Sequence, residues 1–262
     1  MKILFFGDIV GKPGRKAIAA VLPQLRTELQ PNVVMANIEN AAHGKGITKS
    51  TLQDLIAAGI DIGTGGNHSF SKPEAREIYA NEPNIVTRPI NFPNETVGSG
   101  QKMFEVSGKK VYVINLLGEY GMHIDRLENP FSVMGRLLNK GLPTADAIIV
   151  DFHAETTSEK VVMGWYLDGK VSAVLGTHTH VPTADTRLLA KGTAFVTDVG
   201  MVGLRDSSLG VDKDLALQRF LTGTNVAFEI PEHGIVAVNA VLMTFTDGRA
   251  ISMERIYREV TV

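Results

Sequence analysis

The pentapeptide GTHTH at residues 176–180 places two histidines, His178 and His180, one residue apart. Neutral imidazole is a common metal ligand, and it exchanges protons near neutral pH. On an extended segment two such side chains project to the same side, whereas in a loop they can diverge toward two neighbouring ions. Either geometry serves metal binding, but two histidines alone cannot hold an ion firmly, so further ligands must come from elsewhere in the chain.

The amino-acid composition limits which atoms can complete such a site. The 262 residues include no cysteine, so disulfides and thiolate ligands are impossible and nitrogen and oxygen must hold any metal. The 26 basic residues nearly balance the 28 acidic ones, with a formal net charge of -2. A nucleic-acid-coating surface needs a clear basic excess, so we expect a small-molecule substrate and no stable nucleic-acid complex.

Hydropathy gives no indication of a membrane protein. No segment approaches the roughly 20 consecutive apolar residues of a membrane span. Asp8 interrupts the N-terminal apolar run too early for the core of a signal peptide. We therefore expect a cytoplasmic protein without membrane contact. The sequence leaves open whether copies of the chain form a homo-oligomer.

Alternating strand and helix patterns in the first third predict a βαβαβ unit and hence a parallel sheet. No linker, repeat or low-complexity tract interrupts the chain, so we expect a single domain over residues 1–262. Late antiparallel strands argue against the alternative of a (β/α)₈ barrel. The expected strands are 2–6, 32–38, 60–64, 109–117, 146–152, 171–177 and 192–199, followed by a hairpin of 234–245 and 250–260. Helices are expected near 13–29, 48–59, 129–139 and 156–167.

Polar residues that can bind a metal or a phosphate follow five of these strands. The carboxyl ends of parallel strands lie on one edge of a sheet, where ligands bind in open α/β folds. The residues, in chain order, are Asp8 after strand 2–6, Glu39 and Asn40 after 32–38, Asn67 and His68 after 60–64, His153 after 146–152, and His178 and His180 after 171–177.

Each of these residues alone has an ordinary explanation. An aspartate after a glycine is usually a turn residue or a helix cap, and a lone histidine is more often a surface or hydrogen-bonded core residue than a ligand. Their convergence from five places is harder to explain in this way. Six or seven oxygen and nitrogen donors are too many for one four-coordinate zinc ion. They suit two ions that share a bridging carboxylate.

The ordered motifs resemble those of the metallophosphoesterase (calcineurin-like) superfamily, and most closely its YmdB family of bacterial 2′,3′-cyclic nucleotide phosphodiesterases. The resemblance covers most of the chain, from Lys2 to about Phe220. The similar segments are FGDIVGKPGR, NIENAAHGKGIT, GNH, VDFHAETTSEK, GTHTHVPTAD and TDVGMVG. The resemblance implies a four-layer α/β/β/α sandwich with two packed mixed sheets flanked by helices. It also implies a dinuclear metal centre and hydrolysis of 2′,3′-cyclic nucleotides.

The resemblance also assigns roles to individual residues. Val10 stands where the wider superfamily has a histidine ligand, and Asn40 could fill that place. His68 would be the proton donor to the leaving oxygen, after attack by a metal-bridging hydroxide. The first ion would be held by Asp8, Glu39, Asn40 and His180, and the second by Glu39 as bridge together with Asn67, His153 and His178.

The chemistry of a thiol-free site rich in histidine and carboxylate suits iron, manganese or zinc, and iron is our first choice. Two other functions stay open at this point. One is a metal-dependent phosphatase or phosphodiesterase acting on a 5′-nucleotide or phosphoprotein, and the other is a nucleotide-binding signalling protein with slow turnover. Residues 205–214 are expected to be a surface connection, with a mobile loop beside the site as the alternative.

Overall fold

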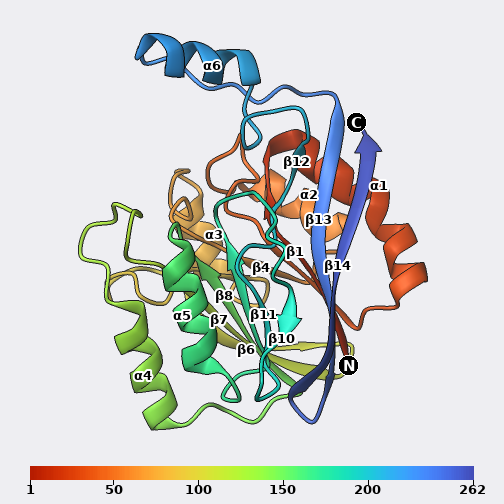
Figure 1. The fold of residues 1–262 in the computed structure, drawn as a ribbon, viewed down its shortest axis with the longest axis vertical. Helices are drawn as coiled ribbons and strands as arrows, with labels where there is room; N and C mark the ends of the chain where they lie inside the picture. The colour runs from red at the N-terminus through yellow and green to blue at the C-terminus, as the bar shows by residue number, and fades with distance from the viewer.

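Two β-sheets occupy the centre of the structure, a computed structural model that describes residues 1–262 (Figure 1). The larger sheet has eight strands. In chain order they are β1 (Lys2–Phe6), β2 (Asp8–Ile9), β3 (Val33–Asn37), β4 (Ile62–Thr64), β5 (Val86–Thr87), β12 (Met201–Leu204), β13 (Ile235–Thr246) and β14 (Arg249–Thr261). Their spatial order is β2-β12-β13-β1-β3-β4-β5, with β14 paired to β13. Strands β1, β3, β4 and β5 run parallel, whereas β13 is antiparallel to β1 and β12.

The smaller sheet has six strands in the spatial order β10-β11-β9-β8-β7-β6. They are β6 (Gln101–Val106), β7 (Lys109–Leu117), β8 (Ala147–His153), β9 (Ala173–Thr177), β10 (Arg187–Leu188) and β11 (Ala194–Val196). Strands β7, β8, β9 and β11 are parallel to their neighbours in this group. Both sheets therefore present parallel carboxyl ends, which is the feature that positions the site.

Helices cover the outer faces of the sheets (Figure 1). Helix α2 begins after a capping box at Thr48, whose side chain accepts from the Thr51 backbone while the Thr51 side chain accepts from the Thr48 backbone. It ends at Gly59, whose backbone is left-handed. The helices are α1 (Gly11–Leu29), α2 (Lys49–Ala58), α3 (Ala75–Asn81), α4 (Pro130–Lys140), α5 (Thr157–Leu167) and α6 (Lys213–Thr222).

Three separate apolar clusters show that the molecule has four layers. Alternate residues of β1 point to opposite faces: Phe6 belongs to the cluster shared with α1 and α2, while Phe5 lies in the cluster between the two sheets. A third cluster joins the other face of the smaller sheet to α5, through Phe152 and Met163. The order of layers is therefore helix, sheet, sheet, helix. This confirms the four-layer α/β/β/α sandwich expected from the resemblance and excludes the (β/α)₈ barrel.

Most elements expected from periodicity are present with bounds that differ by a few residues. The C-terminal hairpin is confirmed as β13 and β14. Its position was not expected, because β13 lies in the interior of the larger sheet between β1 and β12. The short strands β2, β5, β6, β10 and β12 and the helices α3 and α6 were not anticipated. Helix α6 lies outside the four layers (Figure 1) and buries only Ala216.

Among the six helices, none combines the length and the apolar character that a membrane crossing requires.

Candidate metal centre

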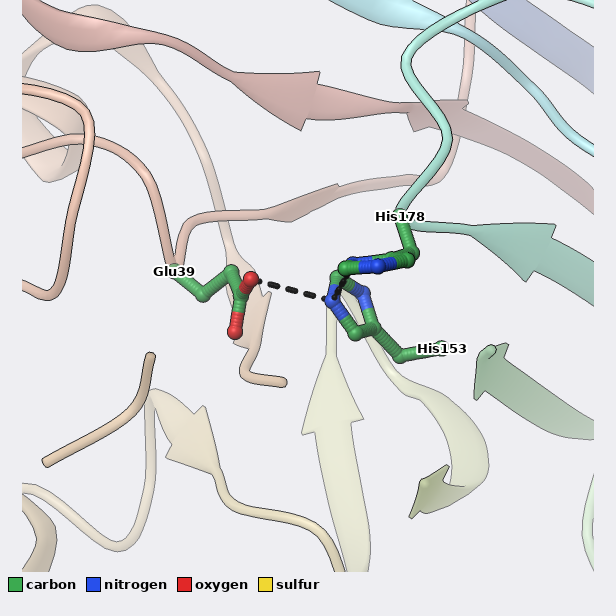
Figure 2. A group of neighbouring side chains, drawn as sticks. All are labelled: Glu39, His153 and His178. Carbon is green, nitrogen blue, oxygen red and sulfur yellow. Dashed lines mark hydrogen bonds and ion pairs between the residues drawn. The ribbon is translucent and has the colours of Figure 1, made fainter. Parts of the chain in front are cut away.

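Side chains from the ends of three strands meet where the two sheets adjoin (Figure 2). Glu39 follows β3 of the larger sheet, while His153 ends β8 and His178 follows β9 of the smaller sheet. His153 Nε2 lies 3.0 Å from Glu39 Oε1 and 3.0 Å from His178 Nδ1. One ligand atom from each residue lies within 4.8 Å of the other two, which is close enough for a single ion to contact all three.

Asp8 and His180 extend this group. Asp8 is fully buried, and its Oδ1 lies 3.7 Å from His153 Nδ1 and 4.0 Å from His180 Nε2. Its other oxygen, Oδ2, accepts a hydrogen bond from the backbone N–H of His178 at 3.0 Å. The carboxylate that follows β1 is therefore in contact with the loop that follows β9, although the two are 170 residues apart in the chain.

Asn67 and His68 approach from the end of β4. Asn67 Oδ1 lies 3.0 Å from His153 Nε2. The backbone N–H of His68 donates to Glu39 Oε2 at 2.7 Å, while its imidazole makes only a long 3.5 Å contact with Ser71 Oγ. Asn40 is different, because its amide nitrogen donates to the Gly44 carbonyl and no hydrogen bond links it to the other predicted residues.

Hydrogen bonds fix which nitrogen of His153 carries the proton. Thr177 Oγ1 donates its single hydrogen to the buried Asp151 carboxylate at 2.7 Å. The same oxygen lies 2.9 Å from His153 Nδ1 and must therefore accept from it. Asn37 Nδ2 also lies 3.3 Å from Nδ1, but its two hydrogens are directed to the Gly65 carbonyl and to Asp151. His153 Nε2 is left with a free lone pair directed at Glu39, which is the tautomer that a metal ligand needs.

The same reasoning applies to His180. Its Nδ1 lies 2.9 Å from the carbonyl oxygen of Leu209, which can only accept a hydrogen bond. The proton therefore sits on Nδ1, and the Nε2 lone pair faces Asp8. Val10 packs against the neighbouring Gly210, where an added Cβ would meet the Val10 side chain. Residues 205–214 thus border the site instead of serving only as a surface connection.

A buried ion pair holds the strained loop that carries both histidines. His178 and His180 have φ values of 99° and 66°, in the left-handed region that non-glycine residues avoid. Thr179 between them donates both its backbone N–H and its hydroxyl to Asp198 Oδ2, at 3.0 and 2.7 Å. Lys160 Nζ donates to the same oxygen at 2.7 Å. Because the loop is not extended, the two imidazoles diverge, one toward His153 and the other toward Asp8.

Burial raises the pKa values of the carboxyls in this group and lowers those of the histidines. It raises the pKa of the Asp8 carboxyl well above its usual value, and the nearby charges of Asp198 and Glu39 add to that shift. Burial also raises the pKa of Glu39. Burial lowers the pKa of His178 to about 4, helped by the neighbouring His153, and lowers that of His153 itself. The imidazoles are thus neutral at physiological pH, and a bound cation would favour ionisation of the carboxyls.

Two further observations show that the residues fit a metal ion. Asp8 Oδ1 and Asn40 Oδ1 are buried yet have no hydrogen-bond partner in the protein. Such atoms are costly unless they bind something. A Cβ at Gly66 would collide with the Glu39 carboxylate and the His153 ring, so only glycine leaves room for these side chains to converge. The donor set of oxygen and neutral imidazole nitrogen suits iron, manganese or zinc.

The sequence model of the YmdB-like protein family matches residues 4–256. The chain belongs to this family. It is 44% identical over 258 residues to a 2′,3′-cyclic-nucleotide 2′-phosphodiesterase of Bacillus subtilis (strain 168), covering 98% of this chain and 96% of the relative. A crystal structure described as a novel phosphatase, from Mycoplasma pneumoniae, superposes with a TM-score of 0.90 at 36% identity, covering 99% of this chain and 93% of the other.

A more distant structure shares the fold of this YmdB-like chain. The calcineurin-like phosphoesterase YfkN from Bacillus subtilis superposes with a TM-score of 0.55 at 13% identity, covering 98% of this chain and 90% of the other. This likeness shows a shared fold, and the family match confirms the resemblance to the YmdB family that the motifs indicated.

Sequence reasoning missed the residues of this YmdB-like chain that hold the predicted ligands in place. Asp151 lies inside an apolar strand and Lys160 inside a helix, and a buried charge in such a position was the available signal. Thr177 and Asp198 lie within GTHTH and TDVGMVG, two motifs that were recognised, but neither residue was assigned a role. Leu209 could not have been found, because it contributes only a backbone carbonyl.

Proposed function

We propose that this chain is a dinuclear metal-dependent phosphodiesterase that hydrolyses 2′,3′-cyclic nucleotides. The family membership supports a phosphodiester hydrolase as the enzyme class. The name of the Bacillus subtilis relative supports a 2′,3′-cyclic nucleotide as substrate. The observation that carries the proposal is the convergence of Glu39, His153 and His178, with their ligand atoms within 4.8 Å, beside Asp8 and His180.

The ligands divide into two overlapping sets in this proposal. Glu39 Oε1 lies 3.0 Å from His153 Nε2, at the centre of the group, and this supports its role as the bridging carboxylate. The unpartnered Oδ1 atoms of Asp8 and Asn40 support their assignment as ligands. One ion would be held by Asp8, Glu39, Asn40 and His180, and the other by Glu39, Asn67, His153 and His178.

When bound, the two ions would supply positive charge beside the phosphoryl oxygens and lower the pKa of a water toward neutrality. The chain itself provides the proton for the leaving ribose oxygen. His68 suits this role because its backbone N–H is fixed to Glu39 while its half-buried side chain makes only one long hydrogen-bond contact. Burial lowers the pKa of His68, and the Glu39 carboxylate opposes that shift. The imidazolium form must donate in the bound complex, where an anionic phosphate raises its pKa.

Metal content measured alongside turnover tests these assignments. Glu39→Ala and His180→Ala should lose metal and abolish hydrolysis of a 2′,3′-cyclic nucleotide. His68→Ala should keep its metal and lose about 10²–10⁴-fold in rate, the usual contribution of a general acid. A panel that includes 5′-nucleotides and phosphopeptides identifies the substrate class. An unchanged rate in a variant that has lost its metal would refute the mechanism.

A further inference from the structure

An exposed carboxylate contacts His178, the one proposed histidine ligand whose tautomer has not yet been assigned. Glu155 Oε2 lies 2.9 Å from His178 Nε2. Glu155 lies in the loop of residues 154–156 between β8 and α5, two residues after His153. Its side chain is 52% exposed, so this contact is not needed to fill the core.

The contact determines which nitrogen of His178 faces the other ligands. An ionised carboxylate only accepts hydrogen bonds, so Nε2 must carry the proton in the neutral imidazole. The lone pair then lies on Nδ1, the nitrogen that is 3.0 Å from His153 Nε2. Without Glu155 the other tautomer, with its proton on Nδ1, would be available to His178 and would block metal binding at that nitrogen. His153 and His180 are fixed by Thr177 and by the Leu209 carbonyl, so His178 alone among the three depends on an exposed partner.

The neighbouring loop leaves room for Glu155 to make this contact. Gly121 has a φ of 79°, and a Cβ added there would lie 2.9 Å from Glu155 Cγ and 3.2 Å from its Cβ. The aliphatic stem of Glu155 therefore packs directly over the backbone of Gly121. This packing restricts the rotamers of the stem and lowers the entropy cost of holding the carboxylate against His178.

We propose that Glu155 is a positioning residue that holds His178 in the metal-binding tautomer and orientation. This inference rests on the proposed function, because it presupposes that His178 Nδ1 binds an ion. Carboxylates that accept from the second nitrogen of a metal-bound histidine generally raise its basicity and fix its ring, and their loss usually costs 10–100-fold in metal affinity. Glu155 touches neither substrate nor metal in this scheme and acts only through His178.

The test is the affinity of the metal-free protein for Mn²⁺, measured by isothermal titration calorimetry with no substrate present. Glu155→Ala should weaken the site that contains His178 by about 10–100-fold. Glu155→Gln should recover most of that loss, because its amide oxygen still accepts from Nε2–H. Glu119→Ala is the matched control, since Glu119 is also an exposed glutamate near the site but its carboxylate accepts from Asn129. It should bind Mn²⁺ like the unaltered protein.

The outcomes separate this inference from the proposal on which it rests. If the unaltered protein binds none of Mn²⁺, Fe²⁺ and Zn²⁺, the metal centre itself is refuted. If the unaltered protein binds Mn²⁺ and Glu155→Ala binds it equally well, the role of Glu155 is refuted while the centre stands. Equal losses in Glu155→Ala and Glu155→Gln would also overturn the inference, because they would show that the charge of Glu155 matters and its hydrogen bond does not. Circular dichroism on each variant confirms the fold.

Discussion

Replacing Lys160 with methionine should destabilise the protein and loosen the loop that carries His178 and His180. Lys160 and Asp198 are each 1% exposed, and their ion pair spans 2.7 Å. Methionine fills most of the space of the lysine stem but leaves the Asp198 carboxylate without a counter-charge. Removing one partner of a buried ion pair typically costs about 3–5 kcal/mol, because the remaining charge stays desolvated.

The structure indicates why the cost should lie within this range. Asp198 keeps three hydrogen bonds after the substitution, two from Thr179 and one from the Gly200 N–H at 2.8 Å. These bonds still solvate the carboxylate in part, but none brings a full positive charge. For a chain of this size each kcal/mol lowers Tm by about 2–4 °C, so the expected decrease is about 6–20 °C.

Differential scanning calorimetry of the metal-free protein measures this effect. Lys16→Met is the control, because Lys16 is exposed on α1 and makes no hydrogen bond or ion pair, so its free energy of unfolding should change by less than about 0.5 kcal/mol. The double variant Lys160→Met/Asp198→Asn should recover part of the loss, since its amide oxygen still accepts from Thr179 while no unpaired charge is buried. A Tm within 2 °C of the unaltered protein in Lys160→Met would refute the reasoning.

Three further results are expected. Gly66→Ala should fold normally, since Gly66 does not have a positive φ. It should fail to bind Mn²⁺ in calorimetry, because its methyl group enters the space between Glu39 and His153, and tight binding would contradict this. Metal affinity, measured by competition with a chromophoric chelator, should rise with pH. The reason is that Asp8 and Glu39 have raised pKa values and must deprotonate to bind, whereas His178, with a pKa of about 4, is already neutral. An affinity that stays flat or falls with pH would show that carboxyl ionisation is not linked to binding. Metal present at about 1,000 times its Kd should stabilise the folded protein by about 4 kcal/mol. Removing it with a chelator should therefore lower Tm by about 8–16 °C, and an unchanged Tm would place the metal outside the folded core.

The sequence was sufficient to predict the strands that end at the site. The β1 segment is a short apolar run ended by a glycine, and Thr48 and Gly59 delimit a helix by capping chemistry that acts within a few residues. Because these signals are local, the chain could be divided into elements and its polar residues assigned to strand ends. The parallel arrangement then follows from the alternation of strands and helices.

The arrangement of distant segments could not be predicted in the same way. Strand β12 pairs with β13, which follows it, and with β2 near the other end of the chain, where Met201 lies beside Asp8; no periodicity within any of the three encodes that pairing. The left-handed backbone at His178 and His180 was equally hidden, since their spacing is compatible with an extended segment. It depends on Asp198, whose hydrogen bonds to Thr179 exist only in the folded chain.

The central claim is that side chains from five strand ends enclose a pair of cations where the two sheets meet. Anomalous diffraction from crystals of the metal-loaded protein, collected on both sides of the absorption edge of the bound element, tests it most directly. The account predicts two peaks about 3.5–4 Å apart, the separation usual for paired-ion sites, with Glu39 contacting both, His153 and His178 contacting one, and Asp8 and His180 contacting the other. A single peak at a surface histidine, with no anomalous signal beside Glu39, would contradict it.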